Sequence, residues 1–204
     1  MNSAGKIAVV TGASSGLGRA VAREFRRRGF TVIALCRHAP EADTADRFLA
    51  VDLTDAEQRT RAAAAIEQEF GRLDVLVNNA GMYRFGETLD IDNGFTTKML
   101  ALHVLTPTRL CLLFGQDMRR QRHGYILNMS SVTAWLAYPG INVYGATKRY
   151  LKNFSRGLHT ELRDYGVYVT AVCPGAVDTD LYNLNEKLRR RLVRSGIMLP
   201  PGKL

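Results

Sequence analysis

The sequence predicts an α/β fold in which helices cover both faces of a parallel sheet. Apolar runs of strand length alternate with amphipathic segments of helix length along nearly the whole chain, which is the pattern of repeated strand–helix–strand units. The length of 204 residues, with 46% hydrophobic and 23% charged residues, suits one globular domain over residues 1–204. These observations predict three layers built on a doubly wound sheet around a single core.

The elements can be assigned in chain order. The first strand is predicted at residues 7–10, and the first helix at 16–28 with Gly29 as its carboxyl cap. The later strands are predicted at 30–36, 48–51, 75–77, 125–129 and 168–173. The later helices are predicted at 55–70, 93–120, 143–165 and 186–194.

Two segments depart from this regular alternation. Residues 37–47 are polar, contain Pro40 and are too short for a good helix, so a loop or a single turn is expected between the second and third strands. A proline-containing tail over residues 199–204 follows the last predicted helix.

Composition excludes several classes of protein. Cys36, Cys111 and Cys173 are odd in number and form no C-x-x-C motif, so neither a disulfide framework nor a metal site is expected, and the thiols are expected to be reduced and mostly buried. No apolar run reaches the roughly 18 residues that cross a bilayer, and no signal-peptide core precedes the first strand. We therefore expect a cytoplasmic protein without a membrane partner.

The chain is strongly basic. Subtracting 19 acidic residues from 28 lysines and arginines gives a net charge of +9, which attracts polyanions. A solvated basic surface and a polyanion-binding face both remain open as interpretations. Because the basic residues are dispersed and no nucleic-acid motif accompanies them, no nucleic-acid partner is predicted.

A glycine-rich turn lies directly between the first strand and the first helix. Glycines there let the backbone turn sharply and approach a pyrophosphate, while the helix N-terminus offers free N–H groups. The spacing is G-x-x-x-G-x-G, and two serines add hydroxyl donors. A dinucleotide phosphate site is therefore predicted at Gly12, Ser14, Ser15, Gly16, Leu17 and Gly18.

The residues that follow the second and third strands indicate which dinucleotide is bound. An acidic residue after the second strand would hold a ribose 2′-hydroxyl, whereas this chain has Arg37, whose guanidinium suits the 2′-phosphate of NADP(H). An ordinary solvated arginine is the alternative. Asp52 and Leu53 end the third strand where an adenine ring could be held edge-on and covered.

Two consecutive amides follow the fourth strand. Asn78 and Asn79, with Ala80 and Gly81 after them, lie at the carboxyl edge of the sheet, where open α/β folds bind ligands. They suit cofactor contact and bracing between strands, and a plain polar turn is the alternative.

A serine, a tyrosine and a lysine form the most informative group. Tyr144 and Lys148 are four residues apart on one predicted helix and therefore share a face. An ammonium beside a phenol is expected to lower the phenol pKa and make Tyr144 a usable acid or base. Ser131 follows the fifth strand, where its hydroxyl could donate to a substrate carbonyl oxygen.

With these motifs in this order, the chain resembles the short-chain dehydrogenase/reductase family from Lys6 to about Leu181. The motifs are Thr11-Gly12-x-x-x-Gly16-x-Gly18, Asn78-Asn79-Ala80-Gly81, Asn128-Met129-Ser130-Ser131, Tyr144-Gly145-Ala146-Thr147-Lys148 and Pro174-Gly175-Ala176-Val177-Asp178-Thr179. The resemblance implies a Rossmann-type seven-stranded sheet, a nicotinamide cofactor, and homodimers or homotetramers formed through two long helices. It also implies cofactor contacts around the nicotinamide by Tyr144, Lys148, Pro174, Gly175, Val177 and Thr179.

Two departures from the family pattern bear on function. Where the family has an asparagine that organises a proton-relay water, this chain has His103, which is expected either to keep the relay or to be a satisfied structural histidine. Family members also continue with another helix and a seventh strand. Because the chain stops at Leu204, we expect the last strand to be missing from the sheet.

These observations predict an NADP(H)-dependent oxidoreductase that interconverts a carbonyl and a secondary alcohol, with Ser131, Tyr144, Lys148 and His103 as catalytic residues. A cofactor-binding scaffold or regulator with little catalysis is the alternative. An apolar or aromatic substrate pocket, or else plain packing, is predicted for Met82, Tyr83, Trp135, Leu136, Tyr138, Ile141 and Leu181.

Overall fold

The structure is a computed structural model, in which residues 5–203 are described. Its centre is a six-stranded parallel sheet with the strand order β3-β2-β1-β4-β5-β6. The strands are β1 (Ile7–Thr11), β2 (Thr31–Cys36), β3 (Arg47–Ala50), β4 (Val75–Asn78), β5 (Gly124–Met129) and β6 (Val167–Val172). The predicted doubly wound α/β fold is confirmed, and each predicted strand agrees with the structure to within one residue at either end.

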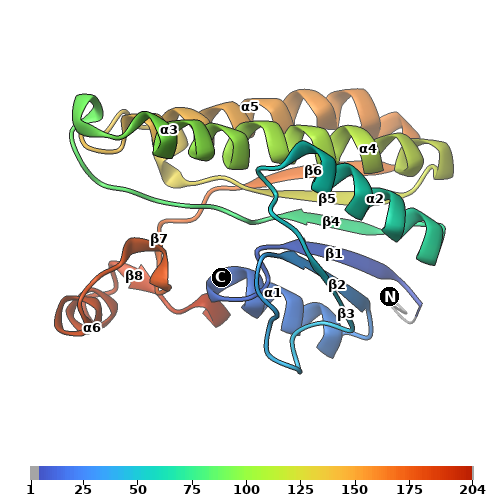
Figure 1. Cartoon of the computed structure of the whole chain (residues 1–204), viewed down its shortest axis with the longest axis horizontal. Coiled ribbons are helices and arrows are strands. Elements are labelled where there is room, and N and C mark those ends of the chain that lie inside the picture. Colours follow the sequence, from blue (N-terminus) through green and yellow to red (C-terminus); the bar gives the residue numbers. More distant parts are fainter. Residues whose placement is uncertain (1–4, 204) are drawn as a thin grey trace.

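Helices cover both faces of this sheet, which makes three layers (Figure 1). One face carries α1 (Gly16–Arg27), and the other carries α2 (Ala56–Phe70), α4 (Thr106–Gln121) and α5 (Asn142–Leu162). A separate apolar cluster fills each interface: Ala22 of α1 belongs to one, and Leu110 of α4 belongs to the other. Strands that are buried on both faces consist of short runs of apolar residues, so the sequence pattern predicted their positions accurately.

The order of the strands creates a place for a ligand. β1 has β2 on one side and β4 on the other. The chain therefore runs from β1 towards one edge of the sheet and from β4 towards the opposite edge. At such a switch point the loops that follow the two strands diverge, and open α/β sheets bind ligands in the crevice between them. The glycine turn follows β1 and the asparagine pair follows β4, so both motifs lie at this crevice.

The helix predicted at 93–120 is continuous but not uniform. It comprises α3 (Asn93–Leu100), a π-helical turn over Ala101–Leu105, and α4. Pro107 has no N–H, so the carbonyl of His103 lacks its ordinary donor four residues ahead. The Thr106 N–H instead donates to the carbonyl of Ala101, five residues back. The sequence analysis missed this π-turn, although Pro107 was its signal.

The abbreviated crossover over residues 37–47 contains no helix, as predicted. Acidic side chains of this loop form ion pairs with basic side chains on α1, which ties the loop to the helix below it. The pairs are Arg19–Glu41, Arg23–Asp43 at 2.7 Å and Arg26–Asp46 at 2.9 Å. Part of the basic surface is thus used within the molecule, close to Arg37.

The carboxyl segment contains structure that was only partly predicted. The expected helix is α6 (Glu186–Arg194), and beyond it β8 (Met198–Leu199) pairs in parallel with β7 (Ala176–Val177). The Asp178 N–H also donates to the carbonyl of Leu199 at 2.8 Å. This two-stranded sheet was not predicted, and it holds the segment after Pro174 beside the crevice.

The thiols agree with the sequence-based expectation. Cys36 and Cys111 are buried, Cys173 is half-buried, and all three are unpaired. Within residues 5–203, no helix is long and apolar enough to span a membrane.

Candidate active site

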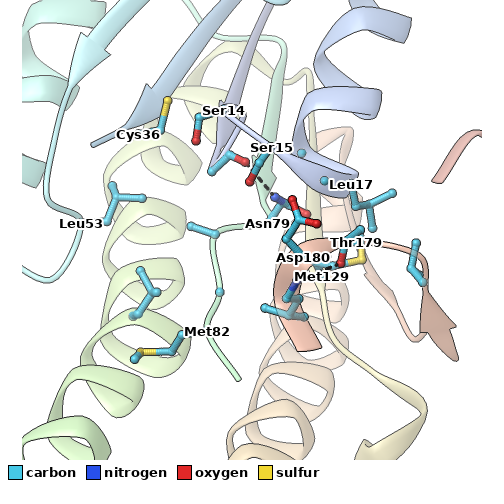
Figure 2. A pocket seen from close by; sticks show the side chains of 18 of the residues that line it. Ser14, Ser15, Leu17, Cys36, Leu53, Asn79, Met82, Met129, Thr179 and Asp180 are labelled. Atoms are coloured by element: carbon cyan, nitrogen blue, oxygen red, sulfur yellow. Dashed lines mark hydrogen bonds between the residues drawn. The ribbon is translucent and has the colours of Figure 1, made fainter. Parts of the chain in front are cut away.

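A cavity of about 440 Å³ opens along the carboxyl edge of the sheet, at the switch point. Figure 2 shows Ser14, Cys36 and Leu53 on one side of it and Leu17 and Thr179 on the other. All the residues assigned to a cofactor from the sequence line this cavity: Gly12, Ser14, Ser15, Gly16, Leu17, Gly18, Arg37, Asp52, Leu53, Asn79, Ala80, Gly81, Tyr144, Lys148, Pro174, Gly175, Val177 and Thr179. Ser131 lines it as well.

The glycine turn forms the wall below β1. Gly12 has a φ of +66°, in the left-handed region where only glycine is unstrained. Gly18 lies so close to the turn that an added Cβ would stand 2.2 Å from the Gly12 carbonyl oxygen. The third glycine therefore lets α1 pack tightly against the start of its own turn, as the spacing predicts.

The variant Gly18→Ala tests this packing. We expect a loss of about 2 kcal/mol or more in the free energy of unfolding, measured with urea, because the methyl group overlaps a backbone carbonyl that cannot move aside. Gly157 on α5 is the matched control, since nothing lies within 4 Å of its added Cβ. Gly157→Ala should gain about 0.5–1 kcal/mol. Equal effects of the two variants would contradict the close approach at Gly18.

The far end of the cavity carries Arg37, whose side chain is exposed. Asp52 lies nearby, and its Oδ1 accepts hydrogen bonds from the N–H of Thr54 at 2.9 Å and from the Thr54 hydroxyl at 2.8 Å. These bonds, with a smaller contribution from Arg37, lower the pKa of Asp52 below its ordinary value. Asp52 is thus a charged carboxylate fixed in a turn at the end of the cavity.

The two asparagines brace neighbouring strands. Asn79 Nδ2 donates to the carbonyl of Thr11 at 3.1 Å, and the Thr11 hydroxyl accepts the N–H of Asn79 at 2.8 Å and of Ala80 at 3.0 Å. Asn78 turns away from the cavity and donates to Asn128 Oδ1 at 2.8 Å. These bonds clamp β1 to β4 and β4 to β5 beneath the crevice, which supports the bracing interpretation.

Ser131, Tyr144 and Lys148 meet in the wall beneath β5. All three are buried, and Lys148 Nζ lies 5.5 Å from the centroid of the Tyr144 ring. The ammonium donates to the carbonyl of Met129 at 2.9 Å, which fixes its position at the end of β5. The Ser131 hydroxyl oxygen accepts the N–H of Thr133 at 3.2 Å, and the hydroxyl is also hydrogen-bonded to the Tyr144 phenol.

The expected lowering of the phenol pKa is not found. Burial raises the pKa of Tyr144 above its ordinary value, and the nearby Tyr182 acts in the same direction, while a hydrogen bond with Ser131 acts in the opposite one. Burial also lowers the pKa of Lys148 to about 8. The expectation considered only the charge of the lysine, whereas the loss of water around both groups is the larger effect. In this structure the phenol is therefore held in its protonated form.

Burial of Lys148 predicts a dependence of stability on pH. Between pH 8 and 10.5 the unfolded chain retains a proton that the folded chain has lost, so stability rises with pH across this window, by about 3 kcal/mol. Lys148→Met should therefore be more stable than the wild type at pH 7, by a margin that shrinks towards pH 10. Urea unfolding without ligands measures this margin. Lys187→Met, at an exposed position of α6, should show neither effect. A margin that is constant with pH would contradict the prediction.

His103 lies behind this cavity rather than in its lining. Its side chain is 1% exposed, and it lines a separate space of about 10 Å³ together with Pro107 and Lys148. Nε2 accepts the N–H of Met82 at 2.9 Å, and Nδ1 lies 3.0 Å from the Thr147 hydroxyl oxygen. Both ring nitrogens are therefore engaged within the protein.

The residues assigned to a substrate pocket divide into two groups. Met82 and Leu181 line the cavity. The others do not line it: Tyr83 packs edge-on against Tyr144 with ring centroids 5.2 Å apart, Ile141 is in a buried cluster, Leu136 and Tyr138 are exposed, and the Trp135 ring lies beneath Lys152.

Lys98 and Tyr182 are among the lining residues that sequence reasoning missed. Lys98 belongs to no motif, so nothing in the sequence singled it out. Tyr182 directly follows Leu181, and its ring packs against Tyr83 at 5.1 Å. Its position next to a predicted pocket residue was the available signal.

The fold and this cavity define a class of protein, the α/β oxidoreductases that bind a dinucleotide at the switch point of a parallel sheet. The family can be stated more closely. Residues 6–189 match the family described as short chain dehydrogenase, and the chain belongs to the short-chain dehydrogenase/reductase family.

Similar proteins of known name agree with this assignment. Serine 3-dehydrogenase of Rhizobium radiobacter is 35% identical in an alignment of 190 residues that covers 84% of this chain and 72% of the relative. The 3-oxoacyl-acyl-carrier-protein reductase FabG of Escherichia coli is 32% identical in an alignment of 188 residues that covers 89% of this chain and 77% of the relative.

Solved structures agree as well. A short-chain dehydrogenase from Streptomyces avermitilis superimposes with a TM-score of 0.84 at 33% identity and covers 100% of this chain and 82% of its own. A short-chain dehydrogenase from Sphingobium yanoikuyae, solved in complex with NADPH, has a TM-score of 0.84 at 27% identity over 97% of this chain and 80% of its own.

Proposed function

We propose that the protein is an NADP(H)-dependent oxidoreductase that interconverts a carbonyl group and a secondary alcohol. The observation that carries the proposal is one cavity along the carboxyl edge of the sheet, lined by Arg37 after β2 and, three strands away, by the buried group of Ser131, Tyr144 and Lys148 beside β5. A dinucleotide laid along such a cavity would place its 2′-phosphate and its nicotinamide at opposite ends.

The residues present fit this cofactor. A side chain at Gly18 would collide with the backbone of Gly12, and a side chain at Gly12 would collide with Ala80. The two glycines therefore allow the tight backbone turn that binds a pyrophosphate. Gly175, which also lines the cavity, has nothing within 4 Å of an added Cβ, which leaves open space for a flat ring. The Arg37 guanidinium is exposed, so it can make charge-assisted bonds to a phosphate. Three similar solved structures contain bound NADP or NADPH.

The chemistry of the proposed reduction follows from the protonation states. When bound, NADPH supplies the hydride for the carbonyl carbon. Ser131 donates a hydrogen bond to the carbonyl oxygen, and Tyr144, which burial keeps protonated, gives its proton to the same oxygen. Lys148 stands beside the resulting phenolate and stabilises its charge.

The substrate is proposed to be a small molecule with an uncharged reacting end. Apolar and aromatic side chains line part of the cavity, namely Met82, Leu181 and Tyr182, and the Tyr182 ring packs on Tyr83, which in turn packs on Tyr144.

Assembly into a homo-oligomer is part of the proposal. Apolar side chains are exposed along the two long helices, namely Leu105 just before α4, Leu112 and Leu113 on α4, and Tyr150 on α5. Such a face favours a partner of like chemistry, and members of the family pair through these helices.

The experiment that tests the function is turnover of a broad panel of ketones and aldehydes with NADPH. Consumption of NADPH with formation of the alcohol is the expected result. The rival function, a cofactor-binding scaffold, predicts tight NADPH binding without reduction of any compound in the panel. Binding measured by the fluorescence of NADPH, alongside turnover, separates the two.

A further inference from the structure

We propose that His103 is a positioning residue, whose neutral imidazole ties the segment after Asn79 to helix α5 and so holds Tyr144 in place, instead of passing protons. The role rests on the proposed function, because Tyr144 is the group it positions. Four features carry the inference: the π-turn, the burial of the ring, its two hydrogen bonds, and the onward bond from Thr147.

The π-turn places the imidazole of His103 between the segment after Asn79 and helix α5. His103 lies within Ala101–Leu105, ahead of Pro107. Its Nε2 stands 3.3 Å from the position of a Cβ on Gly81, so the backbone after Asn79 passes directly over the imidazole. On the other side lies Thr147 of α5, three residues after Tyr144 and directly before Lys148. The imidazole thus bridges the two walls of the cavity.

The hydrogen bonds determine which tautomer is present. The Met82 N–H donates to Nε2 at 2.9 Å, so Nε2 carries no proton. The single proton of a neutral imidazole is then on Nδ1, which donates it to the Thr147 hydroxyl at 3.0 Å. The Thr147 hydroxyl in turn donates a hydrogen bond to the carbonyl of Tyr144 at 2.7 Å. Every donor in the chain Met82–His103–Thr147–Tyr144 has its acceptor.

This arrangement leaves the imidazole no means of relaying protons. Protonation of Nε2 would set its new N–H against the N–H of Met82 and break the bond between them. The ring is buried, and the ammonium of Lys148 on α5 faces it, so its pKa lies well below the ordinary value. The phenol of Tyr144, whose ring centroid is 5.6 Å away, is protonated and uncharged. His103 therefore stays neutral throughout the working pH range.

We call the hydrogen-bonded chain Met82–His103–Thr147–Tyr144 the clamp. Its loss should lower the rate of the reaction and leave substrate and cofactor binding nearly unchanged. Thr147 and Tyr144 belong to the same turn of α5, so the hydrogen-bonded chain fixes that turn relative to the segment at Met82. Small displacements of a reacting group cost large factors in rate, because the chemistry depends on alignment. We therefore expect kcat to fall while the KM values change little.

Thr147→Val and His103→Gln are the variants that test the clamp. Thr147→Val keeps the volume and removes the hydroxyl; His103→Gln keeps an acceptor for the Met82 N–H and removes the bond to Thr147. Each should lower kcat roughly 10-fold, and the double variant should be no worse than either alone. Thr160→Val, which removes a similar hydroxyl-to-carbonyl bond on an exposed part of α5, is the matched control and should leave kcat unchanged.

The pH dependence of kcat distinguishes a clamp from a relay. The clamp predicts that wild type and both variants share the same profile, with no step from the titration of a histidine. A step near pH 6.5 in the wild type that disappears in His103→Gln would overturn the proposal in favour of a relay. So would an unchanged kcat in Thr147→Val.

A measurement that does not depend on turnover is the long-range ¹H–¹⁵N spectrum of the four histidines in the cofactor-free protein. His103 should show the neutral tautomer with the proton on Nδ1 from pH 5.5 to 8.5, and its Nδ1 signal should shift in Thr147→Val. Titration of His103 in this range, or a proton on Nε2, would overturn the clamp even in an active enzyme. If no carbonyl is reduced, the proposed function fails, and this spectrum alone decides whether the clamp exists.

Discussion

Replacing Tyr144 by phenylalanine should lower kcat for carbonyl reduction by roughly 10²–10⁴-fold, the contribution of a positioned general acid. The phenol is the proton donor of the proposed reaction, and burial keeps it protonated at neutral pH. The ring itself packs edge-on against Tyr83 and His103, and these contacts survive the loss of the hydroxyl. Affinity for NADPH and the unfolding midpoint should therefore stay close to those of the wild type.

The matched control for this variant is Tyr150→Phe. Tyr150 lies on the same helix, and its hydroxyl is hydrogen-bonded to the Thr108 hydroxyl at 2.9 Å on the exposed side. Steady-state kinetics with the best ketone of the panel should show normal turnover in Tyr150→Phe. A kcat within threefold of the wild type in Tyr144→Phe would remove Tyr144 from the mechanism and favour the scaffold function.

The second large effect is expected at Arg37. Arg37→Asp should weaken NADPH binding by roughly 10- to 150-fold, the equivalent of the 1.5–3 kcal/mol contributed by a hydrogen bond to a charged group. The new carboxylate also repels the 2′-phosphate, whereas NADH has none. The variant should therefore bind NADH at least as tightly as NADPH, which reverses the preference of the wild type.

Fluorescence titration with both cofactors measures this reversal. Arg37→Lys keeps the charge but loses the planar fork, so its affinity for NADPH should fall between the two. Arg156→Asp, on the exposed side of α5, makes the same change in net charge away from the cavity and controls for long-range attraction of the anionic cofactor. Tighter binding of NADH than of NADPH by the wild type would overturn the assignment of Arg37.

Much of the site could be predicted because its motifs are local. Tyr144 and Lys148 share a face of α5 through their spacing of four, whatever the helix packs against. The glycine turn and the asparagine pair each follow an apolar run, and parallel strands bring their carboxyl ends to one edge. All the predicted cofactor residues consequently line one cavity.

Features that depend on distant segments were not accessible in this way. The pairing of β7 with β8 joins residues about 20 positions apart across α6, and two-residue strands leave no periodic pattern to detect. Trp135 is aromatic and close in sequence to Ser131, yet it does not line the cavity and instead packs on Lys152, a partner 17 positions further along the chain.

By itself, the sequence determined the doubly wound sheet, the edge at which a ligand binds, and the residues that gather there, because strand and helix periodicity and the spacing of the motifs are properties of the local chain. Only the tertiary structure decided the chemical state of those residues. The protonated phenol of Tyr144, the weakened basicity of Lys148 and the tautomer of His103 all depend on burial and on partners contributed by other elements. Desolvation and hydrogen bonding act over a few ångströms in space, and no spacing along the chain records them.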